Sequence, residues 1–282
     1  MMTGALHCGR HTLDLSRPRV MGVVNVTPDS FSDGGRFLDF DRALAHARSL
    51  QADGADLIDV GGESTRPGAS PTSEADEIAR VVPIVEALAR DGALVSVDTM
   101  KPAVMRHAIA AGASMINDVR ALQAPGAIDI VAKSDVAVCL MHMQGEPRTM
   151  QTAPVYGDVV ADVRDFLRAR VVACRSAGVA DDRIAVDPGF GFGKKAAHNL
   201  RLIRELATIV AMGFPVVVGA SRKSSLGKLT GRTAGDRVAA SIAAALAAVA
   251  HGAAIVRVHD VRETVDALKV WRAIETENET TS

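Results

Sequence analysis

The sequence contains few aromatic residues and has almost no net charge. Aromatic residues are 3% of the chain, with one Trp and one Tyr. A glycoside hydrolase is therefore excluded, since it would need aromatic platforms and two facing carboxylates. The formal net charge of -1 gives no general attraction to nucleic acid or to an anionic membrane, so we expect neither as a partner. Any anion binding must come from local basic residues.

Cysteines are also few and scattered. Cys8, Cys139 and Cys174 are odd in number and form no C-x-x-C pair, which argues against a disulfide framework or a zinc knuckle and fits a reducing compartment. No basic-then-apolar signal pattern opens the chain. The longest apolar stretch, residues 238–250, is too short to span a bilayer. We therefore expect a cytoplasmic protein.

Several familiar site motifs are missing. The glycine-rich run at residues 187–194 fits neither the dinucleotide-binding spacing G-x-G-x-x-G nor the Walker spacing G-x-x-x-x-G-K-[ST]. No H-x-H or H-E-x-x-H is present to hold a hydrolytic zinc. Dinucleotide binding, Walker-type nucleotide binding and zinc hydrolysis are therefore not indicated.

What the chain does contain is one event repeated eight times, a buried-strand pattern that breaks into polar and turn residues. The runs begin at Val20 and then cover residues 57–60, 94–97, 114–116, 136–141, 184–186, 216–218 and 255–258. Strands spaced by helix-length segments predict parallel βα units, and eight of them predict an α/β protein with a closed (β/α)8 TIM barrel and its active site where the strands end. At 282 residues we expect one domain over 1–282, with its core at about 18–271 and a disordered tail at 275–282.

The segments between the strands carry helix signals. Asp41 and Ser73 precede helical patterns, Lys101-Pro102 opens another, and a long helix is predicted over 156–176. Residues 238–250 are mostly alanine, so this helix packs closely on the barrel or also against a second subunit. Loops 27–37, 61–73 and 187–198 are rich in Gly, Pro and Ser, as functional lids often are.

Side-chain alternation groups the polar residues at the strand ends. Residues two apart share a face of a strand, so Asn25 pairs with Thr27, Asp98 with Ser96, and Asp59 with Glu63. Such pairs are compatible with an inward-facing ring that is acidic on one side and basic on the other. The acidic side has Glu63, Asp98, Asp187 and the neutral Asn117, and the basic side has Arg222, Lys223, Arg257 and His259. Unpaired cations would be costly, so we assign the basic cluster to function; Asp59, in mid-strand, we interpret as structural.

At these positions the chain resembles a known family. Residues 25–35, 59–68, 116–118, 187–194, 221–223 and 257–260 are similar to the motifs of the dihydropteroate synthase family of bacterial folate synthesis. The likeness runs in unbroken order from about Pro18 to Trp271. It implies that 6-hydroxymethyl-7,8-dihydropterin diphosphate condenses with 4-aminobenzoate to give 7,8-dihydropteroate and pyrophosphate.

The resemblance also implies roles for individual residues. The pterin is expected at Asp98, Asn117, Asp187, Lys223 and Met141; the diphosphate at Asn25, Arg257 and His259; and aminobenzoate at Thr65, Arg66, Phe192 and Ser221, with Arg222 nearby. Mg2+ is the implied cofactor, held partly by Asn25 and mostly by phosphate oxygens and water. Sulfonamide inhibitors and a homodimer are implied as well.

The implied mechanism is departure of pyrophosphate followed by attack of the arylamine on the resulting pterin cation. Asp98 would stabilise the cation, Lys223 would donate to the ring carbonyl, and Arg257 and His259 would stabilise the leaving anion. The first two glycine-rich loops would close to exclude water.

Three alternatives remain to be distinguished by assay. A pterin-binding methyltransferase barrel would share the Asp/Asn ring but would not need the diphosphate cluster. A silent pterin-binding or scaffolding protein would show no turnover. A Schiff-base aldolase acting through Lys223 would be trapped by borohydride.

Overall fold

A computed structural model describes residues 4–26, 36–64, 71–146 and 149–275. Eight strands form one parallel sheet in the order β8-β7-β6-β5-β4-β3-β10-β9, and a single parallel bridge, Val186 to Val216, joins its two edges. The strands are β3 (Arg19–Asn25), β4 (Leu57–Gly61), β5 (Val95–Asp98), β6 (Met115–Asp118), β7 (Ala137–Met141), β8 (Ile184–Asp187), β9 (Val217–Val218) and β10 (Ile255–Val258). The eight predicted strands are all present, and the predicted α/β barrel is confirmed.

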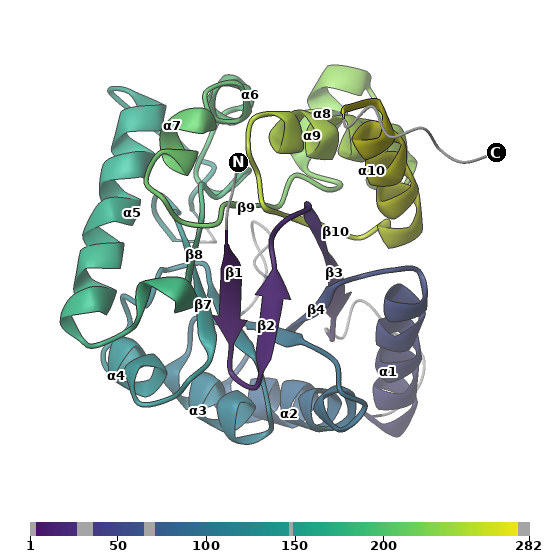
Figure 1. Cartoon of the computed structure of the whole chain (residues 1–282), viewed down its shortest axis with the longest axis vertical. Helices are drawn as coiled ribbons and strands as arrows, with labels where there is room; N and C mark the ends of the chain where they lie inside the picture. Colours follow the sequence, from purple (N-terminus) through teal and green to yellow (C-terminus); the bar gives the residue numbers. More distant parts are fainter. Residues whose placement is uncertain (1–3, 27–35, 65–70, 147–148, 276–282) are drawn as a thin grey trace.

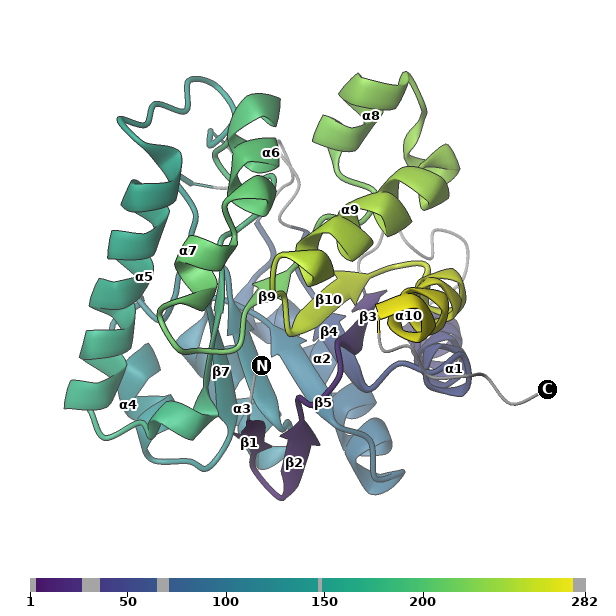
Figure 2. The same cartoon turned by 45° about the horizontal axis from the view of Figure 1, so that its top comes forward.

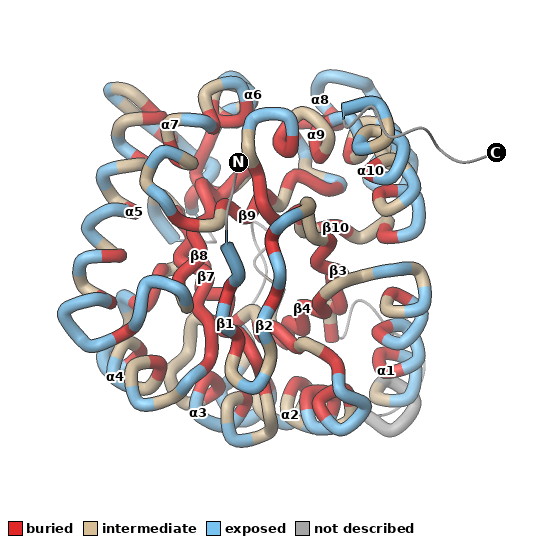
Figure 3. The backbone as a smooth tube through the Cα atoms, viewed as in Figure 1, coloured by how far each residue is buried: buried red, intermediate tan, exposed pale blue. Residues whose placement is uncertain are grey.

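Helices surround the barrel, with their inner sides on the strands and their outer sides exposed (Figures 1 and 3). They are α1 (Arg36–Ala52), α2 (Glu74–Arg90), α3 (Pro102–Ala110), α4 (Ala127–Ala132), α5 (Val159–Ser176), α6 (Ala196–Arg204), α7 (Ala207–Val210), α8 (Ser224–Thr230), α9 (Val238–Ala250) and α10 (Val261–Glu275). Among the residues described, no helix is long and apolar enough to cross a membrane.

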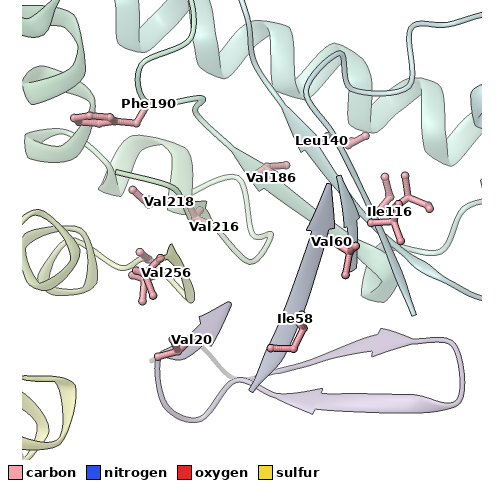
Figure 4. Packing of buried hydrophobic residues seen from close by; sticks show 14 of the residues in the cluster. Val20, Ile58, Val60, Ile116, Leu140, Val186, Phe190, Val216, Val218 and Val256 are labelled. Carbon is pink, nitrogen blue, oxygen red and sulfur yellow. The ribbon is translucent and has the colours of Figure 1, made fainter. Parts of the chain in front are cut away.

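Alternating strand residues point outward and form the main core between strands and helices. Valines and isoleucines such as Val20, Ile58 and Val186 face the helices (Figure 4). β-Branched side chains suit this position because their restricted rotamers pack well on a pleated surface. The strand residues that alternate with these valines and isoleucines therefore face the barrel interior. The polar residues at the strand ends belong to this inward-facing set.

An N-terminal hairpin, which the sequence reasoning missed, closes the amino ends of the strands. β1 (Ala5–Cys8) and β2 (His11–Asp14) pair antiparallel across a two-residue turn, and the pair lies across the barrel end (Figures 1 and 2). Leu6 and Leu13 pack with inward residues such as Met115 in a second, separate core. The signal was available, since apolar residues alternate on both sides of Gly9, whose φ of 61° suits a tight turn.

The helix starts were predicted with mixed success. Ser73 caps α2 by accepting from the Asp76 amide at 3.1 Å, and Pro102 is the first residue of α3, both as expected. α1 begins at Arg36, so Asp41 lies inside it and the prediction that Asp41 precedes the helix is wrong. α5 begins at Val159 instead of 156, where Asp158 accepts from two backbone amides. The predicted disordered tail lies outside the described residues except Glu275, which ends α10.

Candidate active site

Polar side chains line the barrel interior at the carboxyl ends of the strands. Strand register places Asn25 beside Gly61, Gly61 beside Asp98, and Asp98 beside Asn117. Neighbours of the other parity, such as Val60, belong to the helix-facing core. The curvature of the sheet turns these adjacent positions into one concave polar surface, as a barrel mouth requires.

The Arg257 side chain bridges two carboxylates in this surface. Its Nε donates to Asp59 Oδ2 at 2.6 Å and its Nη2 to Asp98 Oδ2 at 2.8 Å. Burial acts to lower the pKa of Arg257, but the two carboxylates outweigh it and raise that pKa. Burial raises the pKa of Asp98, and Arg257 opposes it. The prediction that the basic cluster is unpaired is therefore wrong for Arg257.

Asp187 lies at the end of β8, almost fully buried. Its Oδ1 accepts from the Gly189 amide at 2.6 Å. Burial raises the pKa of the carboxyl to about 6, although that hydrogen bond and the nearby Lys194 and Lys223 act to lower it. A carboxylate in this setting has acceptor capacity left for a ligand with N–H donors.

The glycine-rich turn after β8 is built around Lys194, a residue that sequence reasoning had not placed in the site. Its buried Nζ donates to the carbonyls of Gly189 at 2.9 Å and Phe192 at 3.0 Å, and lies 2.9 Å from His142 Nδ1. Burial lowers the Lys194 pKa to about 7. Gly189 has a φ of 71°, and a Cβ there would lie 1.8 Å from the His142 carbonyl oxygen, so this close approach requires glycine.

That turn places Phe192 beside the residues from the ends of β9 and β10. Lys223 Nζ lies 4.0 Å from the centroid of the Phe192 ring, a cation–π distance. Ser221 Oγ accepts from the His259 amide at 3.2 Å and lies 3.1 Å from His259 Nδ1. Burial, followed by the charges of Arg257 and Arg222, lowers the His259 pKa to about 3. His259 is thus neutral at pH 7, and its assignment to a cationic cluster is wrong.

Two other charged residues of the predicted ring have partners at its edge. Arg222 has a φ of 57°, and its guanidinium binds the Asp260 carboxylate, with Nε to Oδ2 at 3.1 Å. Glu63 accepts from the Thr72 amide at 2.9 Å and pairs with Lys101 at 3.1 Å. Glu63 is thus bound at the base of loop 61–73, and Arg222 is not an unpaired cation.

Two of the remaining predicted site residues, Met141 and Asn25, lie at the ends of strands. Met141, at the end of β7, packs with Phe192 in a small apolar cluster. Asn25 is half-buried at the end of β3. Residues 27–35 and 65–70, which include Thr65 and Arg66, lie outside the described residues. Among the side chains described, no group of three or more His, Cys, Asp or Glu residues is arranged to hold a metal ion.

The fold and this mouth define a class of protein, a (β/α)8 enzyme that binds a ligand with a hydrogen-bonding edge beside basic groups. Comparison with known proteins agrees. The family model for pterin binding enzymes matches residues 21–259. A curated dihydropteroate synthase of Neisseria meningitidis serogroup B is 51% identical over 273 residues, covering 94% of this chain and 96% of the relative.

Solved structures are similar over nearly the whole chain. The Xanthomonas albilineans dihydropteroate synthase with 4-aminobenzoic acid has a TM-score of 0.92 and 52% identity, covering 97% of this chain and 99% of that one. A Yersinia pestis dihydropteroate synthase with a sulfonamide drug has a TM-score of 0.92 and 49% identity (96% and 99% covered). The Burkholderia cenocepacia enzyme with 7,8-dihydropteroate has a TM-score of 0.90 and 51% identity (100% of both). The chain belongs to the dihydropteroate synthase family.

Proposed function

We propose that this chain condenses 6-hydroxymethyl-7,8-dihydropterin diphosphate with 4-aminobenzoate, forming 7,8-dihydropteroate and pyrophosphate for folate synthesis. The observation that carries the proposal is the convergence of Asp98, Asn117 and Asp187 with Arg257 and Lys223 in one barrel mouth. Acceptors for a donor-rich heterocycle and cations for a diphosphate are thereby brought together. A methyltransferase or an aldolase needs only part of this set.

The pterin takes the acidic side of the mouth. Asp187 has remaining acceptor capacity, and the buried Asn117 Oδ1 has no hydrogen-bond partner among the described residues. Both can accept from the amino and ring N–H groups of a pterin, which would satisfy an otherwise costly buried acceptor. Lys223 donates to the ring carbonyl, and Met141 contacts the flat ring.

The diphosphate takes Arg257, His259 and Asn25. Arg257 supplies the charge, and His259, whose pKa burial lowers to about 3 in the free protein, contributes an N–H donor. Aminobenzoate lies against Phe192 and Ser221, with Thr65, Arg66 and Arg222 as its further contacts. Sulfonamide drugs, which resemble aminobenzoate, would compete there.

The reaction breaks the C–O bond of the pterin methylene, and pyrophosphate leaves with the electron pair. The arylamine nitrogen then donates its lone pair to the methylene carbon and loses one N–H proton to solvent. Asp98 stabilises the cation on the pterin, while Arg257 and His259 stabilise the departing anion. Catalysis by these groups is electrostatic, and it needs no dedicated general base because an arylamine is neutral at pH 7.

Mg2+ belongs to this proposal, and the donors at the mouth fit it. A Cβ on Gly61 would lie 3.5 Å from Asp98 Cβ and 3.8 Å from Asn25 Oδ1, so glycine keeps open a gap beside a hard amide oxygen. Mg2+ prefers oxygen ligands and keeps waters and substrate phosphates, so Asn25 would suffice as its protein ligand. When bound, the ion would neutralise charge on the diphosphate.

We also propose a cytoplasmic homodimer. Its three cysteines are all unpaired and buried, as suits a reducing compartment. Ser241 and Ala245 of α9 are buried toward the barrel, whereas Ala239 and Ala243 are exposed, and these would meet a second copy. Sedimentation of wild type and Ala243→Arg tests the dimer: a monomeric variant supports this face, and an unchanged dimer excludes it.

The test of the activity is release of pyrophosphate when both substrates are mixed with the chain and Mg2+. Release should require aminobenzoate. Lys223→Met should lower kcat/KM about tenfold or more, since a charged hydrogen bond is lost. Lys228→Met, on the exposed end of α8, is the matched control and should match wild type. No release of pyrophosphate by wild type would reject the proposal.

A further inference from the structure

Asp59 is a buried carboxylate in the middle of β4, below the residues assigned to the substrates. Its relative exposure is 0%, and its position facing the barrel interior is shared with Ser96 on the next strand, its register partner. A buried carboxylate is costly unless it is paired and hydrogen-bonded. The partners of Asp59 should therefore show why a charged side chain is present at this buried position.

One oxygen of Asp59 holds two residues of the proposed site together. Asp59 Oδ2 accepts from Arg257 Nε at 2.6 Å and from Asn117 Nδ2 at 3.1 Å. These partners belong to different tasks, because Arg257 is assigned to the diphosphate and Asn117 to the pterin. Asp59 itself is too deep to be the group that meets the diphosphate.

The bond to Asn117 decides which way its amide faces. Because Nδ2 is directed to a carboxylate, which only accepts hydrogen bonds, the other amide atom, Oδ1, is directed away from Asp59. This Oδ1 is buried and has no hydrogen-bond partner among the described residues. It is an acceptor left for a donor of the ligand. With Asn in place of Asp59, the acceptor would be a neutral amide oxygen, so the hydrogen bond that sets this orientation would be weaker.

The hydrogen bond from Arg257 Nε to Asp59 fixes the position of the guanidinium at its Nε end. Its second contact is to Asp98, which the proposed function gives to the pterin. If a bound pterin hydrogen-bonds to Asp98 and weakens the Arg257–Asp98 contact, the hydrogen bond from Arg257 Nε to Asp59 still fixes the plane of the guanidinium.

We propose that Asp59 is a positioning residue that sets the acceptor oxygen of Asn117 and the guanidinium of Arg257 at the same time. It thereby joins recognition of the pterin to recognition of the diphosphate. The proposal rests on the proposed function, since it uses the ligands assigned there.

The first test is Asp59→Asn, with calorimetry on two separate probes, 6-hydroxymethyl-7,8-dihydropterin without phosphate and inorganic pyrophosphate with Mg2+. Affinity for each probe should fall about tenfold, because the charged hydrogen bond that positions its partner becomes a neutral one. Ser96→Ala is the matched control: it is buried in the same layer, its Oγ has no partner among the described residues, and it should bind both probes as wild type does.

The second test is the double variant Asp59→Asn with Asn117→Asp. It restores an amide–carboxylate bond between the two positions and again offers an acceptor oxygen to the pterin, but Arg257 Nε meets only a neutral amide. Pterin affinity should return to within about threefold of wild type, which is under 1 kcal/mol, while pyrophosphate affinity stays reduced. A merely structural role would not separate the two probes.

The outcomes are decisive in each case. Binding of both probes by Asp59→Asn within about threefold of wild type would overturn the inference, as would a folded double variant that recovers neither probe. If Asp59→Asn does not fold, the double variant is compared directly with wild type and must show the same split. Absence of pyrophosphate release by wild type would instead reject the proposed function.

Discussion

The two ends of the barrel interior use the same strands and the same alternation, yet they contain opposite chemistry. At the amino ends, the inward positions carry Met21, Leu57 and Met115, which the β1–β2 hairpin covers. A few residues further along the same strands, the inward positions carry Asp59 and Asn117, with Arg257 opposite. Backbone geometry is therefore not what distinguishes the two ends.

This difference indicates that one end of the barrel interior mainly stabilises the fold, whereas the other end is suited to binding a ligand. The hairpin end is apolar and covered, so its side chains gain from burial and contribute little to ligand binding. The mouth contains buried acceptors, such as Asn117 Oδ1, that have no hydrogen-bond partner among the described residues; such groups cost free energy unless a ligand satisfies them. Substitutions at the two ends should consequently have separable effects.

The largest effect is expected for Asp187→Ala at the mouth. Loss of a charged acceptor, at about 1.5–3 kcal/mol per hydrogen bond, together with the unpaired donors left on the ligand, should abolish measurable binding of the pterin diphosphate by calorimetry while circular dichroism shows a folded protein. Near-wild-type affinity in the folded variant would remove Asp187 from the pterin site.

At the end covered by the hairpin, Met115→Ala should lower the stability of the protein and leave pterin affinity unchanged. Met115 is fully buried, and truncation of such a side chain costs about 2–5 kcal/mol of unfolding free energy. Denaturant unfolding measures the loss. Pterin affinity of the folded fraction should be unchanged, and a large drop in affinity would show that the two ends are coupled.

Arg257→Ala and His259→Ala should have different effects on ligand binding, although both residues lie at the mouth. Arg257 holds Asp59 and Asp98, so its removal should weaken both pyrophosphate and the phosphate-free pterin, by about 1.5–3 kcal/mol for pyrophosphate. His259 contacts Ser221 instead, so His259→Ala should weaken pyrophosphate alone. Titration calorimetry with both ligands decides, and equal losses in His259→Ala would contradict this division.

Pterin affinity should depend on pH through Asp187. Its pKa is raised by burial to about 6, so a proton must leave before the carboxylate can accept from the pterin. Affinity should fall as the pH drops through 6 and be about tenfold weaker or more at pH 5; Asp98, whose pKa burial raises to about 7, adds to the loss between pH 8 and 6. His259→Ala should keep this profile, because His259 is already neutral there. A flat profile from pH 5 to 8 would reject an ionised Asp187 as the acceptor.

The smallest effect is expected outside the barrel interior. Ser73→Ala removes the cap of α2 and should lower unfolding free energy by about 1 kcal/mol, with substrate affinities unchanged. Thermal unfolding beside the calorimetric titrations checks both parts. Loss of activity here would mean that α2 contributes to the mouth.

Local patterns explain why much of the fold was predictable. The outward run of Val and Ile repeats in each strand, and Ser73 and Pro102 are helix-start residues whose preferences depend on neighbours in sequence. The hairpin was missed because it is not part of the βα repeat. The α1 boundary was misjudged because tertiary packing can override the preference of Asp for helix caps, and Asp41 lies inside α1.

The repeat of eight strands, the polar residues at the strand ends and the family motifs can all be identified from the order of residues along the chain. Which of those residues contact one another depends on how the chain folds. Asp59 and Arg257 are 198 positions apart, and their contact makes Arg257 a paired cation. Burial likewise decides that His259 is neutral and that Asp187 titrates near pH 6. Desolvation and charge pairing depend on what surrounds a group in space, and sequence order does not contain that information.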